Sequence, residues 1–332
     1  MKDKNYVEAK NQTFELPKIV IIVLNWNGLS ITYKNTPILD LCLDSILNLK
    51  YSNLKVIVVD ANSEDGSVSY LKKKFLNQLD IVTSKNIGWA HNNNVGIKYA
   101  LRVYPDAQYI FLMSNDIIFT DKNWLNKFIM IIPKNDISIG VIGCKLLNTD
   151  GTIQNSGLFL NKIGLFGTYT FDRKDGCLTK NEYIVGAFMI ITTDCLKNVG
   201  YLDEIYDKMG SEDTDFEERA RLFGYNVFYI NSLNVVHLGS ASTFKLETKI
   251  TNRWDINQLR SDMNRNFYLF LLRYHKFKFL LYLAYDFIKA FIGIKPNIHI
   301  RGYKEIMTNL KNLNIEINSA RNAYNKIKNY RV

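Results

Sequence analysis

The sequence predicts an α/β fold in which parallel strands are covered by helices on both faces. Short, continuously apolar runs rich in β-branched residues alternate with stretches of helical rhythm. Each run closes with a polar turn that contains Asn, Asp, Gly or Ser. The 332 residues are 47% hydrophobic and 13% aromatic, which argues against disorder. This length allows one large α/β domain with an appendage, or two modest domains.

The first half of the chain carries the clearest alternation of strands and helices. Strands are predicted over 18–24, 54–59, 80–83 and 109–113, and helices over 37–49, 67–79 and 92–104. In open sheets of this kind, ligands bind at the carboxyl ends of the strands. The polar turns NWNG, DANSEDGS and SND follow three of these strands. We therefore expect functional side chains in these turns.

The second half is less regular and ends in a helical region. Strands are predicted over 141–147, 151–160, 183–192, 226–230 and 233–236, a loop over 164–176, and helices over 194–199 and 212–223. The last helix has acids in its first turn, Arg219 and Arg221 in its last turn, and Gly224 at the expected C-cap. From residue 255 the pattern is helical, with an apolar run over 266–294 and a polar amphipathic stretch over 301–330.

Cysteine spacing and the N-terminus predict the cellular compartment. The four cysteines, Cys42, Cys144, Cys177 and Cys195, show no CxxC spacing, which predicts reduced, buried thiols and disfavours a structural zinc site. Residues 1–17 form a polar tail without the apolar core of a signal peptide. These features predict a cytoplasmic protein.

The net charge of +10 is concentrated at the C-terminal end. Residues 253–332 hold 15 Lys and Arg against 5 Asp and Glu, whereas the rest of the chain holds 27 of each. Charged residues break the apolar run 266–294, so it offers no stretch of about 20 clean residues for a membrane span. The interrupting residues are Arg273, Lys276, Lys278, Asp286 and Lys289. An amphipathic helix on an anionic membrane surface fits this pattern, as does packing on the main domain or a homodimer contact.

Strand-end acids are candidate ligands for a nucleotide and a cation. Asp60 follows the second strand, where it can bind a base or ribose, or simply cap a turn. Asp116 follows the strand 109–113, and a hard cation such as Mg²⁺ or Mn²⁺ prefers such oxygen ligands. The turn 85–96, with Asn86 and Gly88, offers donors to a sugar or phosphate. No GxGxxG follows the first strand and no P-loop occurs, which disfavours dinucleotide dehydrogenases and P-loop NTPases.

Residues 201–242 combine a dense group of acids with a solitary histidine. His237 stands at the end of an apolar run. A helix N-terminus favours acids through its dipole, and a lone histidine is commonly a hydrogen-bonded core residue, so both features have a purely structural interpretation. Eight acids lie within 16 residues: Asp203, Glu204, Asp207, Glu212, Asp213, Asp215, Glu217 and Glu218.

The ordered blocks together resemble a known family. They are IVIIVLNWNG, VIVVDANSEDGS, NIGWAHNNNVG, YIFLMSND, VGAFMIIT, VGYLDEIY, SEDTDFEERARLFGY and VVHLGSAS. Their order and spacing resemble the family 2 inverting glycosyltransferases, most closely the rhamnosyltransferase-like branch. The resemblance implies a glycosyltransferase A-type fold, a Rossmann-like mixed sheet flanked by helices, over residues 18–250. Residues 251–332 then form a basic amphipathic helical region.

The resemblance also implies roles for individual residues. Asp213 is the expected general base, and Glu212 orients it or contacts the acceptor. Asp116 and His237 are the expected metal ligands, although the triplet Ser114-Asn115-Asp116 keeps only one acid of the family's DxD motif. The nucleotide-sugar contacts implied are Asn25, Asn27, Asp60, Asn86, Gly88 and Asn115.

We therefore expect an inverting glycosyltransferase that uses a nucleotide-diphospho-sugar, with Mg²⁺ or Mn²⁺ balancing the charge of the leaving diphosphate. The resemblance implies a glycan acceptor, often lipid-linked, in polysaccharide biosynthesis of the cell envelope, with the enzyme peripheral at the inner face of the membrane. A sugar-1-phosphate nucleotidyltransferase is the alternative enzyme class, disfavoured because NWNG replaces its Gly-rich loop. A nucleic-acid-binding protein is disfavoured because the C-terminal bases are interleaved with apolar stretches.

Overall fold

The computed structural model describes residues 15–133, 136–162, 166–172, 178–206, 210–239 and 256–291. The helical stretch expected over 301–330, most of the polar tail 1–17 and the thiol of Cys177 lie outside the described residues.

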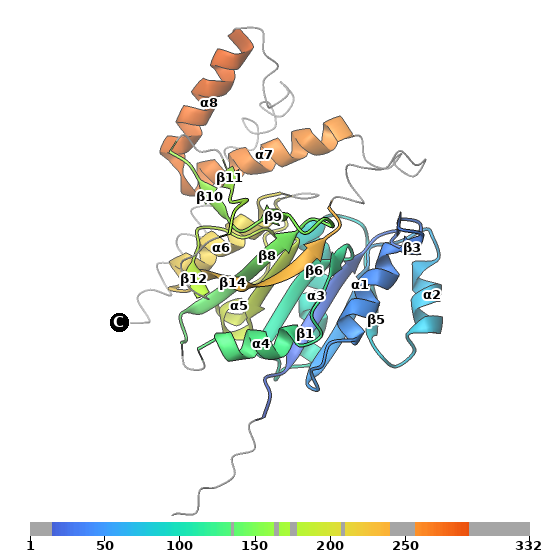
Figure 1. Cartoon of the computed structure of the whole chain (residues 1–332). Helices are drawn as coiled ribbons and strands as arrows, with labels where there is room; N and C mark the ends of the chain where they lie inside the picture. The colour runs from blue at the N-terminus through green and yellow to red at the C-terminus, as the bar shows by residue number, and fades with distance from the viewer. Residues whose placement is uncertain are drawn as a thin grey trace, which may run out of the picture.

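The centre of the molecule is a mixed sheet in the order β12-β14-β8-β13-β6-β1-β4-β5 (Figure 1). The half of the sheet built by the first part of the chain is parallel, as predicted: β1 pairs with β4 and β6, and β4 pairs with β5. Every residue of β1 is buried, as expected for a strand covered on both faces. The parallel strands are β1 (Ile19–Asn25), β4 (Leu54–Asp60), β5 (Asp80–Thr83) and β6 (Tyr109–Ser114).

The second half of the sheet is mixed. β13 (Phe188–Thr192) runs antiparallel to both β6 and β8 (Ile139–Leu147), and β14 (Asn226–His237) runs parallel to β8. The short strand β7 (Ile117–Ile118) pairs with the end of β14. Two further short strands, β9 (Ile153–Asn155) and β12 (Leu178–Lys180), pair with β8 and β14.

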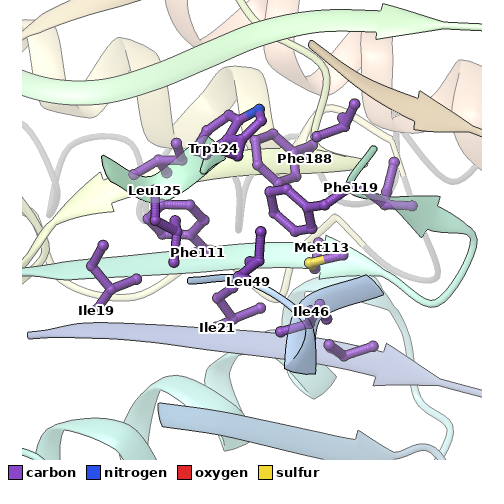
Figure 2. Close-up of a cluster of buried hydrophobic side chains, with 14 of the residues drawn as sticks. Ile19, Ile21, Ile46, Leu49, Phe111, Met113, Phe119, Trp124, Leu125 and Phe188 are labelled. Carbon is purple, nitrogen blue, oxygen red and sulfur yellow. The ribbon is translucent and has the colours of Figure 1, made fainter. Parts of the chain in front are cut away.

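Helices cover both faces of the sheet (Figure 1). On β1, Ile19, Ile21 and Val23 face one apolar cluster, whereas Val20 and Ile22 face the other, in the two-residue period of a strand. Figure 2 shows the first cluster, in which the rings of Phe111, Trp124 and Phe188 meet edge to face. Its helices are α1 (Ile38–Leu47), α2 (Ser67–Lys74) and α4 (Trp124–Ile131); those of the second cluster are α3 (Trp89–Val103), α5 (Thr193–Val199) and α6 (Glu212–Leu222).

The C-terminal helices form a third apolar cluster with a short hairpin. α7 (Ile256–Tyr274) lies next to β10 (Leu158–Leu160) and β11 (Phe166–Thr168), and α8 (Lys276–Phe291) projects away from the sheet (Figure 1). The fully buried rings of Tyr268 and Phe270 anchor α7 there. Among the described residues, the longest apolar helices fall short of what a bilayer crossing requires.

The structure corrects several predicted boundaries. Gly157, with φ 115°, divides the strand expected over 151–160 into β9 and β10. The two strands expected over 226–236 form the single strand β14, with an irregularity between Ile230 and Asn234. Sequence analysis missed α4 and the hairpin β2 (Thr32–Tyr33)–β3 (Thr36–Pro37), and the loop expected over 164–176 contains β11. These elements are short, and a short apolar run does not show by its periodicity whether it forms a helix, a strand or a loop.

The strand expected over 183–192 begins only at Phe188. We call the preceding residues segment 183–187. They are apolar and mostly buried, which explains the prediction, but they form no continuous ladder: Tyr183 makes an isolated bridge to Leu158 of β10, and the Ile184 and Gly186 amides bond to side chains of α6, as described below. The expected free thiols are confirmed for Cys42, Cys144 and Cys195, all buried. Burial raises the pKa of the Cys195 thiol to about 12, so it stays protonated and unreactive.

Candidate active site

The loops after β1, β4 and β6 are joined by side-chain hydrogen bonds. Asn25 Nδ2 donates to Asp60 Oδ2 (2.8 Å), and Asn115 Nδ2 donates to Asn25 Oδ1 (2.7 Å). The backbone amide of Asn27 donates to Ser63 Oγ (2.8 Å). A Cβ at Gly28 would lie 2.4 Å from Asn25 Oδ1, so the loop admits only glycine there without rearrangement. The structure thus brings together four of the six predicted nucleotide contacts.

Asp60 lies beneath this network. Its side chain has no exposed area, and its second oxygen, Oδ1, accepts the amide of Ser63 (2.9 Å). The backbone carbonyl of Asp60 accepts the amide of Ser84, which starts the loop that holds Asn86 and Gly88. Asp60 therefore ties the loops after β4 and β5 together. Ser63, which sequence analysis did not single out, connects Asp60 to the first loop.

Asp116 and His237 meet at one end of the sheet. β7 starts immediately after Asp116 and pairs with β14, so that Ile117 is the register partner of His237. The Leu238 amide also donates to the Asp116 carbonyl (3.0 Å). His237 Nε2 consequently lies 3.3 Å from Asp116 Oδ2. Burial alone would raise the pKa of the Asp116 carboxyl, but the proximity of His237 and a hydrogen bond from the Ser114 hydroxyl outweigh it and lower the pKa.

Gln154 fixes the orientation of the His237 ring. His237 Nδ1 lies 2.5 Å from Gln154 Oε1, and the Gln154 amide nitrogen donates to Asn148 Oδ1 (3.2 Å). Because Oε1 can only accept, Nδ1 carries the hydrogen. Nε2 then faces the Asp116 carboxylate oxygen, and an imidazole nitrogen beside a carboxylate oxygen is a donor set found in divalent metal sites.

The protein supplies only part of a metal shell at this place. Across the described ranges, no group of three or more His, Cys, Asp and Glu side chains could hold a metal ion. Asp116 and His237 would supply two ligands, and substrate oxygens would have to supply others. The side-chain amide nitrogen of Asn115 already donates a hydrogen bond to Asn25 Oδ1.

The N-terminus of α6 presents Asp213 between two backbone amides. Its Oδ2 accepts the amide of Gly186 (2.8 Å), and its Oδ1 accepts the amide of Thr214 (2.7 Å). The side chain stays partly exposed, whereas neighbouring Glu212 is 5% exposed. Burial raises the pKa of the Asp213 carboxyl, and burial together with the charge of Asp213 raises that of Glu212 well above its usual value. Asp213 is thus held in one orientation, and its raised pKa makes the ionised carboxylate more basic than an ordinary Asp, a property that suits a general base.

Segment 183–187 connects the two chemical groups of the site. The Ala187 carbonyl accepts the amide of Ser114 (3.1 Å), and the Gly186 amide holds Asp213. A Cβ at Gly186 would lie 2.9 Å from Asp213 Oδ2, so only glycine allows this approach. Sequence analysis did not single out Gly186 or Gln154, because each acts on a residue distant in the sequence.

Asp215 anchors α7 to α6, the helix that carries Asp213. Fully buried, it accepts hydrogen bonds from Arg219 Nε (2.8 Å), Arg273 Nη1 (2.7 Å) and Tyr274 Oη (2.7 Å). Arg273 also bonds Asp203 Oδ2 (2.7 Å). Arg273 is therefore part of an internal network and contributes little to the surface charge of the C-terminal region.

The family model described as Glycosyl transferase family 2 matches residues 29–200, which is more than half of the chain. The chain belongs to glycosyl transferase family 2. This match supports a glycosyltransferase over the two alternatives, a sugar-1-phosphate nucleotidyltransferase and a nucleic-acid-binding protein. The residues matched do not include α6 or β14. The support for roles of Asp213 and His237 is therefore the geometry of the site.

Curated relatives and solved structures agree with this placement. The O-antigen biosynthesis protein RfbC of Myxococcus xanthus is 24% identical over 68% of this chain and 18% of that protein. The poly-beta-1,6-N-acetyl-D-glucosamine synthase of Staphylococcus epidermidis is 26% identical over 56% of this chain and 43% of its own length. The chain thus spans less than half of either relative.

Solved structures confirm the expected glycosyltransferase A-type fold. The structure of GalNAc-T7 with UDP, GalNAc and Mn²⁺ superposes with a TM-score of 0.61 at 13% identity, over 92% of this chain and 55% of that one. The structure of residues 1–349 of S. aureus TarS with UDP has a TM-score of 0.52 at 16% identity, over 77% of this chain and 65% of that one.

Replacing Gly186 by Ala should impair transfer more than stability. The new Cβ would push the Asp213 carboxylate out of place, and a misplacement of about 1 Å can cost roughly a hundredfold in rate. We expect kcat to fall about tenfold to a hundredfold, measured with the native donor and acceptor. Gly140→Ala is the matched control, because its Cβ would lie 2.6 Å from Tyr225 Cβ, away from the acids. Equal kcat losses in both variants would contradict this role of Gly186.

Proposed function

We propose that this glycosyltransferase moves a sugar from a nucleotide-diphospho-sugar to a glycan acceptor with inversion, and that Asp213 is the general base. The observation that carries the proposal is the Asp213 carboxylate, oriented by two amides yet partly exposed at the N-terminus of α6. Of the acids in the first turn of α6, Glu212 and Asp215 are buried. Asp213 alone among the three combines a fixed orientation with access to substrate.

In this mechanism Asp213 takes the proton of the acceptor hydroxyl as that oxygen bonds to the anomeric carbon. The bond from that carbon to the nucleoside diphosphate breaks on the opposite face, which inverts the configuration. Because burial raises the pKa of Asp213, ionised base is lost as pH falls through a value above about 3.9, the ordinary Asp pKa. Glu212, whose pKa is raised well above its usual value, keeps its proton and would help to orient the neighbouring base.

The donor class follows from the loops at the strand ends. Asn25, Asn27, Asp60 and Asn115 form one network there, next to the loop of Asn86 and Gly88. UDP is bound in the GalNAc-T7 and TarS structures, and GDP-Man in the mannosyltransferase PcManGT. These ligands support a nucleotide-diphospho-sugar donor for this chain.

Asp116 and His237 would hold a divalent cation, Mg²⁺ or Mn²⁺, at the donor diphosphate. Their facing acceptor atoms and the Gln154 bond support this assignment, and Mn²⁺ is present in the GalNAc-T7 and PcManGT structures. Such an ion would supply positive charge where the leaving diphosphate develops negative charge. Asp116 and His237 position that charge; they take no part in proton transfer.

The acceptor is proposed to be a growing, lipid-linked glycan at an anionic membrane surface. The names of two relatives, an O-antigen biosynthesis protein and a polysaccharide synthase, support a glycan. α8 carries exposed apolar side chains on one face: Phe277 (73% exposed), Leu280 (60%), Leu281 (36%), Tyr285 (39%) and Ile288 (61%). Exposed Lys276 adjoins them, and residues 253–332 carry the whole excess of positive charge. This combination suits insertion between anionic headgroups.

Asp213→Asn should abolish transfer and preserve donor binding, because an amide cannot accept the proton. Transfer would be measured with the purified protein, and donor binding by titration calorimetry. Thr214→Ser is the control, because it keeps the amide that bonds Asp213 Oδ1. A variant Asp213→Asn within about tenfold of wild type, equivalent to roughly 1.4 kcal/mol of barrier, would refute the assignment.

Asp116→Ala and His237→Ala should each weaken Mn²⁺-dependent binding of a nucleoside diphosphate by about tenfold or more, and should hardly change binding of the nucleoside alone. The cation links protein to phosphate, so only phosphate-dependent affinity depends on it. Asp106→Ala, at an exposed carboxylate paired with Lys18, is the control and should bind as wild type. Full activity in excess EDTA would remove the metal from this mechanism.

The triple variant Phe277→Ser, Leu280→Ser, Ile288→Ser should lose binding to anionic vesicles. We expect the wild-type protein to sediment with anionic vesicles at low salt and less at high salt, because each Lys or Arg near the surface contributes about 1 kcal/mol that salt screens. The control replaces Leu76, Met130 and Ile137, which are equally exposed outside α8, by Ser. Equal recovery of wild type with anionic and neutral vesicles, or of wild type and triple variant, would contradict the proposal.

A further inference from the structure

Glu217 is a buried acid for which the proposed reaction has no use. It lies in α6 four residues after Asp213, on the same side of the helix, and its side chain has no exposed area. An acid in such a place is costly unless it is paired, neutral or required. The question is which of these conditions holds for Glu217.

The contacts of Glu217 continue those of Asp213. Glu217 Oε1 accepts the amide of Ile184 (3.0 Å), just as Asp213 Oδ2 accepts the amide of Gly186 (2.8 Å). Two acids one helical turn apart thus bind two alternate amides of segment 183–187. The other oxygen of Glu217, Oε2, has no hydrogen-bond partner in the described parts of the chain.

Arg221 is the cation whose charge acts on Glu217, but within the described residues its printed ion pair is with Glu218, and its influence does not offset burial. The titratable groups around it are Asp213, Glu218 and Arg221 on α6 and Tyr183 on segment 183–187. Arg221 is engaged by Glu218 (3.2 Å) and by the carbonyl of residue 182, and Tyr183 also bonds Glu218. Burial, and then the negative charge of Asp213, raise the pKa of the Glu217 carboxyl well above its usual value. A neutral acid is the state these surroundings allow.

We propose that Glu217 is a positioning residue that works as a neutral carboxylic acid: it holds the Ile184 amide and so fixes segment 183–187, whose Gly186 amide orients Asp213. The proton resides on Oε2, and Oε1 accepts the amide. This arrangement fixes the segment without placing a second full negative charge one turn from the base. The inference rests on the proposed role of Asp213.

The kinetic test compares an isosteric and a truncating variant. Glu217→Gln keeps an acceptor for the Ile184 amide, so kcat should stay within about threefold of wild type, with the acid limb of the kcat/KM pH profile in place. Glu217→Ala removes the acceptor, so kcat should fall about tenfold or more with little change in donor KM. Asp40→Asn, a buried acid on α1 bonded to Tyr70, controls for loss of any buried acid and should leave kcat unchanged.

These outcomes separate the alternatives. Wild-type kcat in Glu217→Ala would refute the positioning role. A displacement of the acid limb to lower pH in Glu217→Gln would show that Glu217 is charged in the wild-type protein, because removing a negative neighbour lowers the pKa of Asp213. A Glu217→Gln variant as impaired as Glu217→Ala would also overturn the proposal.

A second readout does not depend on transfer. A carboxyl whose pKa is raised on folding stabilises the folded state below its unfolded pKa, about 4.3 for Glu, and this contribution is lost as pH rises toward the folded pKa. Because Gln does not titrate, the melting temperature of wild type minus that of Glu217→Gln should fall as pH rises above that value. A constant difference would refute a neutral Glu217. This result stands even if Asp213→Asn proves active, so the two proposals fail separately.

Discussion

The hydrogen bonds between the acids of α6 and the amides of segment 183–187 are the constraint on which the site depends. A buried amide must find an acceptor, and the strand contacts of this segment lie at its two ends, where Tyr183 bridges Leu158 and Ala187 accepts from Ser114. Asp213 and Glu217 supply acceptors to Gly186 and Ile184 instead. At its far end the segment accepts the Ser114 amide. The same five residues therefore set the distance between Asp213 and the end of β6.

The pairing of Asp116 with His237 depends on a second backbone feature. The short strand β7 reverses direction after Asp116 and joins the end of β14. Without this pairing, two residues separated by about a third of the chain would have no reason to meet. The pair places an imidazole nitrogen and a carboxylate oxygen 3.3 Å apart, with Gln154 bonded to the other ring nitrogen. Backbone pairing and a single amide side chain therefore set the geometry of this pair.

The helix α6 joins the active site to the C-terminal region through its other side chains. Asp215 and Glu218 face α7 and its C-terminal end, where they bond Arg273, Tyr274 and His275. Movement of α7 would thus act on the helix that carries Asp213. Arg273 is buried in this network and so adds little positive charge to the surface. The exposed apolar face of α8 is then the feature of this region that suits binding to a membrane surface or a partner.

The sequence alone determined the parallel half of the sheet and its functional edge. β1, β4 and β6 are continuous apolar runs, and such runs have few alternatives to a doubly covered strand because every residue must be buried. The polar turns that close them had to lie together, since parallel strands end at one edge. Asn25 and Asp60 accordingly meet where the sequence placed them.

Only the tertiary structure decided what the remaining residues do. Apolar segment 183–187 has the composition of a strand, yet its Ile184 and Gly186 amides bond to side chains of α6, and this pairing depends on contacts between distant residues. Gln154 and Glu217 carry no local pattern, because one acts through the His237 ring and the other through a backbone amide. A sequence pattern reports burial and periodicity over a few turns. Which acid faces which amide is fixed only when the elements pack, and the candidate catalytic geometry lies in those pairings.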